Sequence, residues 1–271
     1  MRRGLLLMCI YSLIAGGDTC ALAEPQTPAY RLKSINATSS LETSRKVLDF
    51  SYDSNGRLTE EMVTKVDSCN PNSSYYNYSL KFNYKYSENK LTVMLDGREY
   101  SSYNLKNGNI QEKALGYKNG RLESLNYTSL RWIDPLDDEF DKVVFHWKDE
   151  DIVAASFYNG HREIGTLSYE YREEKCNSPL VYAYTFIWNP NPSIFWFETW
   201  TNHAAMLHCG LPIPDRLIDA CRWSTGISTV FTYTFDSDGN PTSMSYNIPK
   251  NDFEYFTITE LFTWQRQPGG Q

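Results

Sequence analysis

Tyr52-Asp53-Ser54-Asn55-Gly56-Arg57-Leu58-Thr59 is the stretch of sequence that decides the fold. Before it, Leu48, Phe50 and Tyr52 alternate with polar residues, as in a strand with one buried face. After it, the alternation continues from Leu58 to Thr64. Between the two, Gly56 supplies the left-handed residue that a tight reversal needs, and Asp53 can cap the turn through its carboxylate. The stretch therefore predicts a β-hairpin.

The same turn chemistry recurs along the chain. Asn-Gly and Asp-Gly pairs tolerate the positive φ angles of tight hairpins, and weaker turn signals at 87–90 and 148–151 lie between alternating aromatic segments. At least six hairpin tips predict a long antiparallel meander, which must curl or cover its edges because open edges promote aggregation. We expect an all-β fold, curved into a barrel-like or porin-like shell. The clearest pairs are Asn107-Gly108, Asn119-Gly120, Asn159-Gly160 and Asp238-Gly239.

One segment interrupts the hairpin pattern. Asn202 and Gly210 are a start and a stop signal for a short helix, and residues 215–222 could form a second helical turn. We expect a short helical insertion near 202–222, between the hairpins of the shell.

The N-terminus has the features of a secretory signal. Arg2 and Arg3 precede an apolar run, and Ala21-Leu22-Ala23 is a small-x-small cleavage site. We expect a signal peptide at 1–23, an extended lead-in at 24–45, one β domain at 46–264 and a disordered tail at 265–271. Export to the periplasm or cell surface follows, with a lipoprotein modified at Cys20 as the alternative.

Charge and hydropathy exclude some classes of partner. Removing residues 1–23 takes away Arg2, Arg3 and Asp18, so the formal charge changes from −7 to −8. Lysine and arginine are scattered, which argues against nucleic acid as a partner. After the signal, no apolar run approaches the length of about 18 residues that a membrane-spanning helix requires. We therefore expect no integral membrane span.

Four cysteines remain after residue 23. In an oxidising compartment this even number predicts two disulfides, although sequence alone does not choose among the three pairings. Proximity favours Cys209 with Cys221, which leaves Cys69 with Cys176. The alternative is that some or all of them are buried thiols.

The turns resemble known repeats. The string at 52–59 is similar to the YD repeats of Rhs-type and teneurin-type shells, and Phe235 to Thr242 is a looser copy. Gly210-Leu211-Pro212, followed by the hairpin from Phe231 to Tyr246, resembles a family of exported Bacteroidetes proteins of unknown function. The resemblance covers roughly 46–264. It implies a porin-like antiparallel fold and brings no catalytic residues.

Aromatic residues between 186 and 200 are the first candidate for binding. Indole rings can stack on sugars, so Trp188, Trp196 and Trp200 are the predicted ligand-binding residues. The alternative is a hydrophobic lid in which Phe195 and Phe197 pack inward.

Catalytic and metal-binding patterns are weaker. His208 adjoins Cys209, but neighbours on a helix point about 100° apart, and His203 is five residues from His208, which suits neither a nucleophile and its base nor a zinc pair. The acidic run at 134–141 lacks the glycine spacing of a calcium loop and is expected to be a solvated connection. We assign no catalytic residue, no metal site and no cofactor.

These observations favour a non-enzymatic, exported cell-envelope protein that binds a ligand or partner, such as a glycan or an envelope protein. Two alternatives stay open. One is a carbohydrate-binding or carbohydrate-active protein that uses the aromatic cluster at 186–200. The other is an outer-membrane β-barrel, which would require an uninterrupted apolar outward face.

Overall fold

The computed structural model describes residues 30–40, 43–74, 77–111, 113–118, 121–126, 141–149, 151–176, 178–182, 207–208, 216–249 and 255–267. Nearly all of these residues lie in antiparallel strands, which confirms the all-β prediction. The strands are β1 (Tyr30–Ser39), β2 (Ser44–Tyr52), β3 (Leu58–Asp67), β4 (Tyr78–Ser87), β5 (Lys90–Leu95), β6 (Arg98–Lys106), β7 (Asn109–Ile110), β8 (Leu115–Lys118), β9 (Arg121–Asn126), β10 (Lys142–Lys148), β11 (Asp151–Asn159), β12 (Arg162–Lys175), β13 (Arg216–Trp223), β14 (Ser228–Phe235), β15 (Pro241–Pro249) and β16 (Tyr255–Arg266). A 3-10 helix, η2 (Pro179–Tyr182), follows β12.

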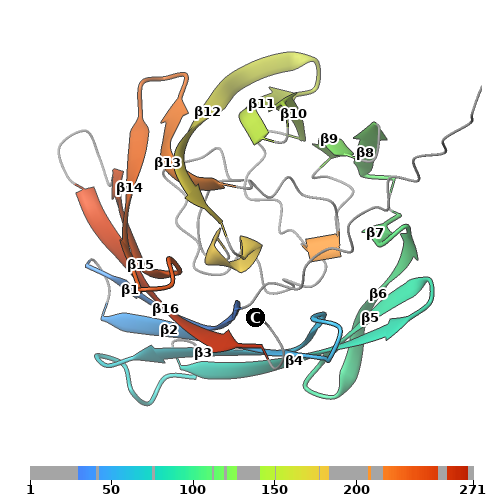
Figure 1. Cartoon of the computed structure of the whole chain (residues 1–271), viewed down its shortest axis with the longest axis vertical. Coiled ribbons are helices and arrows are strands. Elements are labelled where there is room, and N and C mark those ends of the chain that lie inside the picture. The colour runs from blue at the N-terminus through green and yellow to red at the C-terminus, as the bar shows by residue number, and fades with distance from the viewer. Residues whose placement is uncertain are drawn as a thin grey trace, which may run out of the picture.

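The strands form one sheet that curls into a shell (Figure 1). Each strand pairs with its neighbours in sequence, except that β7 and β8 do not pair with each other, and β1 also pairs with β16 from Tyr30↔Arg266 to Ser39↔Ile258. The first and last strands therefore meet in the middle of the sheet, whose edges are the short strands β7 and β8. This confirms the predicted barrel-like meander.

Two segments differ from the sequence-based expectation. Tyr30–Ser39, within the expected lead-in at 24–45, is extended but belongs to the sheet as β1. The expected helical turn at 215–222 is wrong, because Arg216–Trp223 is strand β13, paired with both β12 and β14. Within the interruption, Leu207 and His208 are helical.

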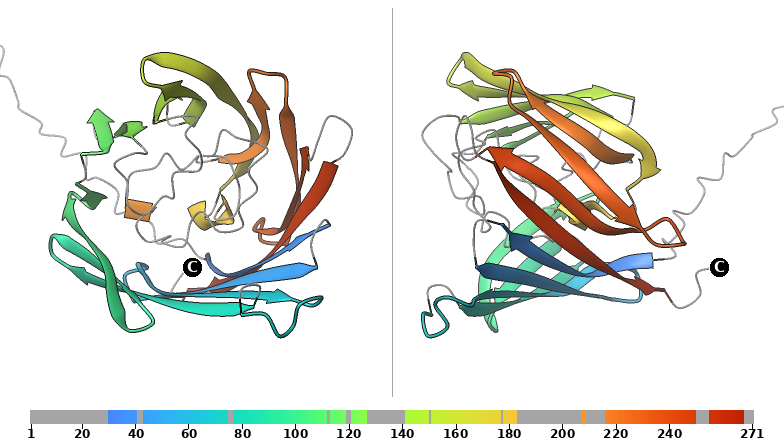
Figure 2. Two further views of the ribbon diagram at one scale, coloured as in Figure 1. Left: turned by 180° about the vertical axis from the view of Figure 1, so that it is seen from behind. Right: turned by 90° about the vertical axis from the view of Figure 1, so that its left-hand side faces the viewer.

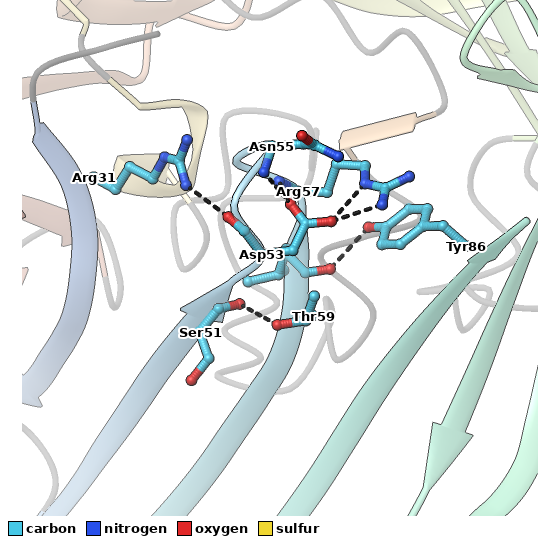
Figure 3. Close-up of polar contacts among 8 residues, drawn as sticks. Arg31, Ser51, Asp53, Asn55, Arg57, Thr59 and Tyr86 are labelled. Atoms are coloured by element: carbon cyan, nitrogen blue, oxygen red, sulfur yellow. Dashed lines mark hydrogen bonds and ion pairs between the residues drawn. The ribbon is translucent and has the colours of Figure 1, made fainter. Parts of the chain in front are cut away.

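The turn at 53–57 has the predicted chemistry (Figure 3). Asp53 Oδ1 accepts hydrogen bonds of 2.9 Å from both Asn55 N and Arg57 N, and Gly56 has a φ of 83°. The turn at 236–240 repeats the arrangement, because Asp236 Oδ1 accepts from Asp238 N at 3.0 Å and from Asn240 N at 2.8 Å. The carboxylate caps both reversals.

The two-residue turns depend on left-handed backbone instead. Asn107 and Gly108 have φ angles of 52° and 79°, as the Asn-Gly signal predicts. Asp96-Gly97, with φ angles of 48° and 82°, forms an equivalent turn between β5 and β6 that the sequence analysis had not singled out.

A repeated side-chain contact joins the strands in pairs. Taken in order along the chain, the strands form eight successive pairs, from β1 with β2 to β15 with β16. In six of these pairs, an aromatic residue near the end of the second strand donates a hydrogen bond to a backbone carbonyl of the first. Five of the six are hairpins, and the sixth joins β8 to β7, the two edge strands of the sheet. We call this contact the aromatic clasp. Its members are Tyr52 to Leu32 O (2.8 Å), Tyr86 to Leu58 O (2.9 Å), Tyr117 to Ile110 O (3.1 Å), Trp147 to Leu122 O (3.0 Å), Tyr171 to Ile152 O (2.5 Å) and Trp264 to Pro241 O (2.6 Å).

Arginine covers several of these rings. The guanidinium of Arg31 lies 5.5 Å from the ring centre of Tyr52, that of Arg57 lies 4.8 Å from Tyr86, and that of Arg121 lies 5.2 Å from Trp147. In all three hairpins the arginine immediately precedes the residue whose carbonyl accepts the clasp. The Arg-Leu pair after the turn is therefore a packing unit that fixes one rim of the shell.

The connection between β12 and β13 leaves the shell at this same rim, because antiparallel neighbours place alternate connections at opposite rims. Its described parts contact two distant walls (Figures 1 and 2). The Tyr182 hydroxyl accepts a hydrogen bond of 2.8 Å from Ile218 N on β13. Far along the sheet, His208 Nδ1 lies 2.8 Å from Gly108 O, and its ring contacts Tyr86. The insertion thus ties both walls together.

The core lies on the concave face of the sheet. Buried residues alternate with exposed ones along the strands, for example Phe82 and Tyr84 against Lys85 on β4. Leu180 and Val181 of η2, which lies inside the ring in Figure 1, belong to the same apolar cluster as these strand residues. The inner face is therefore the buried one.

Candidate ligand site on the inner face

A continuous row of side chains crosses the inner face where the chain ends meet. Strand register places Met244 opposite Glu260, Glu260 opposite Ala37, and Ala37 opposite Lys46. Tyr233 extends the row on β14, where it faces Met244. Both ionisable members are buried, with Glu260 0% and Lys46 4% exposed. Small Ala37 separates them, so this part of the apolar face contains two ionisable side chains in one row.

Glu260 is the least expected residue of the row. Its Oε1 accepts a hydrogen bond of 3.1 Å from the Tyr246 hydroxyl, whereas its Oε2 is buried without a hydrogen-bond partner among the described residues. Burial raises the pKa of Glu260 to about 8, because the ionised carboxylate is not solvated there. At neutral pH the group is mainly a neutral carboxyl, which can donate or accept a hydrogen bond.

Beside the row, the hydroxyls of Tyr182 and Tyr233 and the backbone of Ile218 form a closed set of hydrogen bonds. Ile218 N donates to the Tyr182 hydroxyl at 2.8 Å, and the Tyr233 hydroxyl donates to Ile218 O at 2.8 Å. Because Tyr233 uses its proton in that bond, the 3.2 Å contact between the two hydroxyls has Tyr182 as the donor. Burial raises the pKa of both phenols. This closed ring anchors η2 to β13 and β14.

A second carboxylate is buried on the same face. Glu61 is 0% exposed, and its Oε2 accepts a hydrogen bond of 2.7 Å from the Tyr84 hydroxyl. Glu61 lies four residues along β3 from Lys65, which continues the row of Glu260 three strands away. With about 4.8 Å between strands and about 3.3 Å per residue, the two carboxyls are about 20 Å apart. Paired carboxylates of glycoside hydrolases lie within about 10 Å, so these two do not form such a pair.

Glu260 could have been found from the sequence. Phe256, Ile258 and Phe262 alternate along β16, and Glu260 occupies the same face as these apolar residues. A carboxylate in an inward position of an otherwise apolar alternation is the signal. Glu260 belongs to none of the aromatic and acidic clusters of the sequence, so those clusters do not indicate it.

The site residues predicted from the sequence do not belong to the row of Glu260. Trp188, Trp196, Trp200 and Cys209 lie outside the described residues. The disulfide prediction is not confirmed, because Cys69 and Cys221 are thiols in the structure, and Cys176 Sγ donates a hydrogen bond to Ser178 O at 3.2 Å. Cys221 is buried within the core cluster, and burial raises its pKa, as expected of a packing thiol.

His208, considered above as a base or metal ligand, has a packing role. Its ring lies 5.4 Å from that of Tyr86, and burial lowers its pKa. Within the described part of the chain, no group of three or more His, Cys, Asp or Glu side chains could hold a metal ion. In the same residues, no helix is long and apolar enough to cross a membrane.

Comparison with known proteins supports the fold. A porin-like protein from Bacteroides uniformis has a similar crystal structure, with a TM-score of 0.59 over 89% of this chain and 100% of that chain, at 16% sequence identity. A porin-like protein from Bacteroides vulgatus matches with a TM-score of 0.36 at 9% identity, over 86% of this chain and 98% of that chain. No family model matches the sequence, and no curated protein does. At 16% identity, the likeness to the B. uniformis protein concerns the fold alone.

Proposed function

We propose that the protein is an exported, non-enzymatic cell-envelope protein that binds a mainly apolar ligand on the inner face of its shell, beside Glu260. The observation that carries the proposal is the fully buried Oε2 of Glu260, which has no hydrogen-bond partner in the part of the chain that the structure describes. Most buried polar atoms have partners, so an unpaired carboxyl oxygen is a place where a ligand can complete the bonding. Met244 and Phe262 would supply the apolar contact.

Support for export comes from the secretory pattern at residues 1–23. The periplasm or the cell surface, as well as lipid attachment at Cys20, are part of this proposal. The porin-like description of the B. uniformis protein is consistent with an envelope location.

We propose further that the outer face of the shell meets water. On β4 the residues opposite the core are Ser79, Lys81, Asn83 and Lys85. Lys81 also forms an ion pair of 2.8 Å with Glu60 on β3. An outer-membrane barrel instead needs an apolar band of about 25 Å on this face. The chain lacking residues 1–23 is expected to stay monodisperse without detergent. A strict requirement for detergent would favour the outer-membrane alternative.

Ligand binding is tested by identifying the compounds that stay bound to the protein during purification. The purified chain is extracted with chloroform and methanol, and the extract is compared by mass spectrometry with that of Glu260→Leu, which removes the polar group. We expect the wild-type extract to contain a compound that the variant loses. Thr259→Ala is the matched control, because Thr259 is the neighbouring residue on the opposite face of β16.

Circular dichroism first establishes that the variants are folded. Identical extracts from wild type and Glu260→Leu, or extracts without any bound compound, would contradict the proposed site. Glu260→Gln then distinguishes a need for hydrogen bonding from a need for a titratable group.

Glycan binding through Trp188, Trp196 and Trp200 stays a separate prediction, with its own test. A polysaccharide array compares wild type with the triple alanine variant. Equal retention by both proteins would exclude the aromatic platform.

A further inference from the structure

We propose that the open edge of strand β6 binds an extended, acidic polypeptide segment, which adds to the sheet as a new strand. The proposal concerns the outside of the shell and does not depend on the inner ligand site. It rests on the backbone, the exposed side chains and the charges along this edge, which faces away from β5 (Figure 1).

The first observation is an unpaired stretch of backbone. Strand β6 pairs with β5 from Arg98 to Asn104, but its other side pairs with β7 only at Leu105 and Lys106. Gln111 N donates to Asn104 O at 2.8 Å, and the ladder with the chain beyond β7 ends there. Among the described residues, Arg98 to Ser102 have no strand on that side. The other edge strand of the sheet, β8, contacts β7, because the Tyr117 hydroxyl donates to Ile110 O at 3.1 Å.

Backbone direction shows which residue would pair first. Leu105 N donates to Asn89 O, on the side of β5, whereas Asn104 O points to the open side. Because backbone groups alternate along a strand, the N–H and C=O of Ser102 point to the open side as well. The Ser102 side chain is exposed, so an incoming strand has access to this backbone.

The second observation is the side chains beside the edge. Tyr100 is 50% exposed although its ring contacts Phe82 of the core at a centroid distance of 6.3 Å. Ser101 Oγ is buried and has no hydrogen-bond partner among the residues that the structure describes. An added strand would cover the tyrosine and could satisfy the hydroxyl, which indicates a segment that alternates apolar and polar residues.

The charged residues beside the β6 edge indicate which kind of peptide segment would bind there. Arg98, Lys106 and Lys113 are exposed along this edge, and none has an ion-pair partner among the described residues. In the sequence, Glu99 and Glu112 are the two acidic residues between Arg98 and Lys113. The stretch 98–113 therefore has a net charge of +1, whereas the whole chain carries a formal charge of −7. Cations flanking an open edge favour an acidic partner strand and disfavour a basic one.

The test uses a capped, fluorescently labelled heptapeptide that alternates valine with aspartate, measured by anisotropy. We expect saturable binding to wild type, and at least tenfold weaker binding to Ser102→Pro, because proline removes the outward N–H at an edge position. Lys106→Glu should weaken binding several-fold. Lys85→Glu is the matched control, since Lys85 is an exposed lysine on the outer face of β4, and it should bind like wild type.

Each other outcome overturns the proposal. No binding of the aspartate peptide, equal binding to Ser102→Pro, or equal binding of a peptide with lysine in place of aspartate would exclude an acidic strand at this edge. A wild-type dimer that Ser102→Pro converts to a monomer would assign the edge to a second copy instead. If Ser102→Pro does not fold, Lys106→Glu and Arg98→Glu against Lys85→Glu decide the question.

Discussion

Two buried carboxyl groups on the inner face, those of Glu260 and Glu61, differ in their hydrogen bonding. Glu260 and Glu61 are both fully buried and both accept a hydrogen bond from a tyrosine hydroxyl. Of the two, only Glu260 has an oxygen that lacks a hydrogen-bond partner among the described residues. Burial raises the pKa of Glu260 to about 8. The unsatisfied oxygen therefore distinguishes Glu260, a potential binding group, from Glu61, a structural one.

The raised pKa of Glu260 predicts a pH dependence of stability. Below pH 4.5 the carboxyl is protonated in the folded and unfolded states alike. As the pH rises towards 8, the unfolded chain releases this proton more readily than the folded one, so the free energy of unfolding falls, by on the order of 4 kcal/mol in total. Glu260→Gln should remove this loss.

Urea denaturation between pH 4 and 9 measures the effect. Glu173→Gln, at an exposed carboxylate of β12, controls for the change of side chain. If wild type and Glu260→Gln lose stability equally over this range, Glu260 does not hold a proton in the folded protein.

At the scale of an element, the two Asp-capped turns form a natural pair. Gly56 and Gly239 have φ angles of 83° and 81° and occupy the same position of the turn. Their surroundings differ. A Cβ on Gly56 would lie 2.2 Å from Arg31 Nη2, whereas a Cβ on Gly239 would have nothing within 4 Å.

Alanine substitution should separate backbone strain from crowding. Gly239→Ala introduces only a left-handed alanine and should cost about 1 kcal/mol. Gly56→Ala should cost more, because Arg31 must also leave its position over Tyr52 and its hydrogen bond to Asp53 O. Thermal and chemical denaturation of both variants measure the difference. Equal losses would mean that Arg31 moves aside freely.

The elements also show what sequence can predict. Turns such as Asn107-Gly108 were predicted because their φ requirement is local and only a few residues meet it. Strand β13 was not, because a register shift occurs opposite Tyr171, where Ile218 and Ala220 flank an extra residue. Burial of Leu217, Ile218, Ala220 and Cys221 then follows a spacing that resembles a helix. Whether Glu260 Oε2 has a hydrogen-bond partner depends on contacts between strands distant in sequence, so no local pattern reveals that it lacks one among the described residues.

At the scale of the whole molecule, closure depends on the first strand. β1 lies between β2 and β16, and Leu32, Ile35 and Ala37 of this strand are fully buried. Removing residues 1–43 would expose the edges of β2 and β16 together with the core beneath them. Open apolar edges pair with other chains. We expect this truncation to aggregate or fail to fold, whereas a chain lacking only residues 1–23 folds.

Circular dichroism and size-exclusion chromatography compare the two truncations. A folded monomer lacking residues 1–43 would show that the shell does not need its β1–β16 junction.

The aromatic clasps have a consequence for how such a shell can diversify. The clasps join strand ends at one rim of the shell, next to its turns. The hydrogen bonds between the strands therefore do not depend on the residues in the loops of that rim. One rim already carries a two-residue turn at 88–89, five-residue turns at 53–57 and 236–240, and the long connection at 176–215. That rim therefore accommodates loops of different lengths and sequences. Foreign segments grafted between β4 and β5 should leave the barrel architecture intact, which makes the fold suited to changing its recognition properties without being rebuilt.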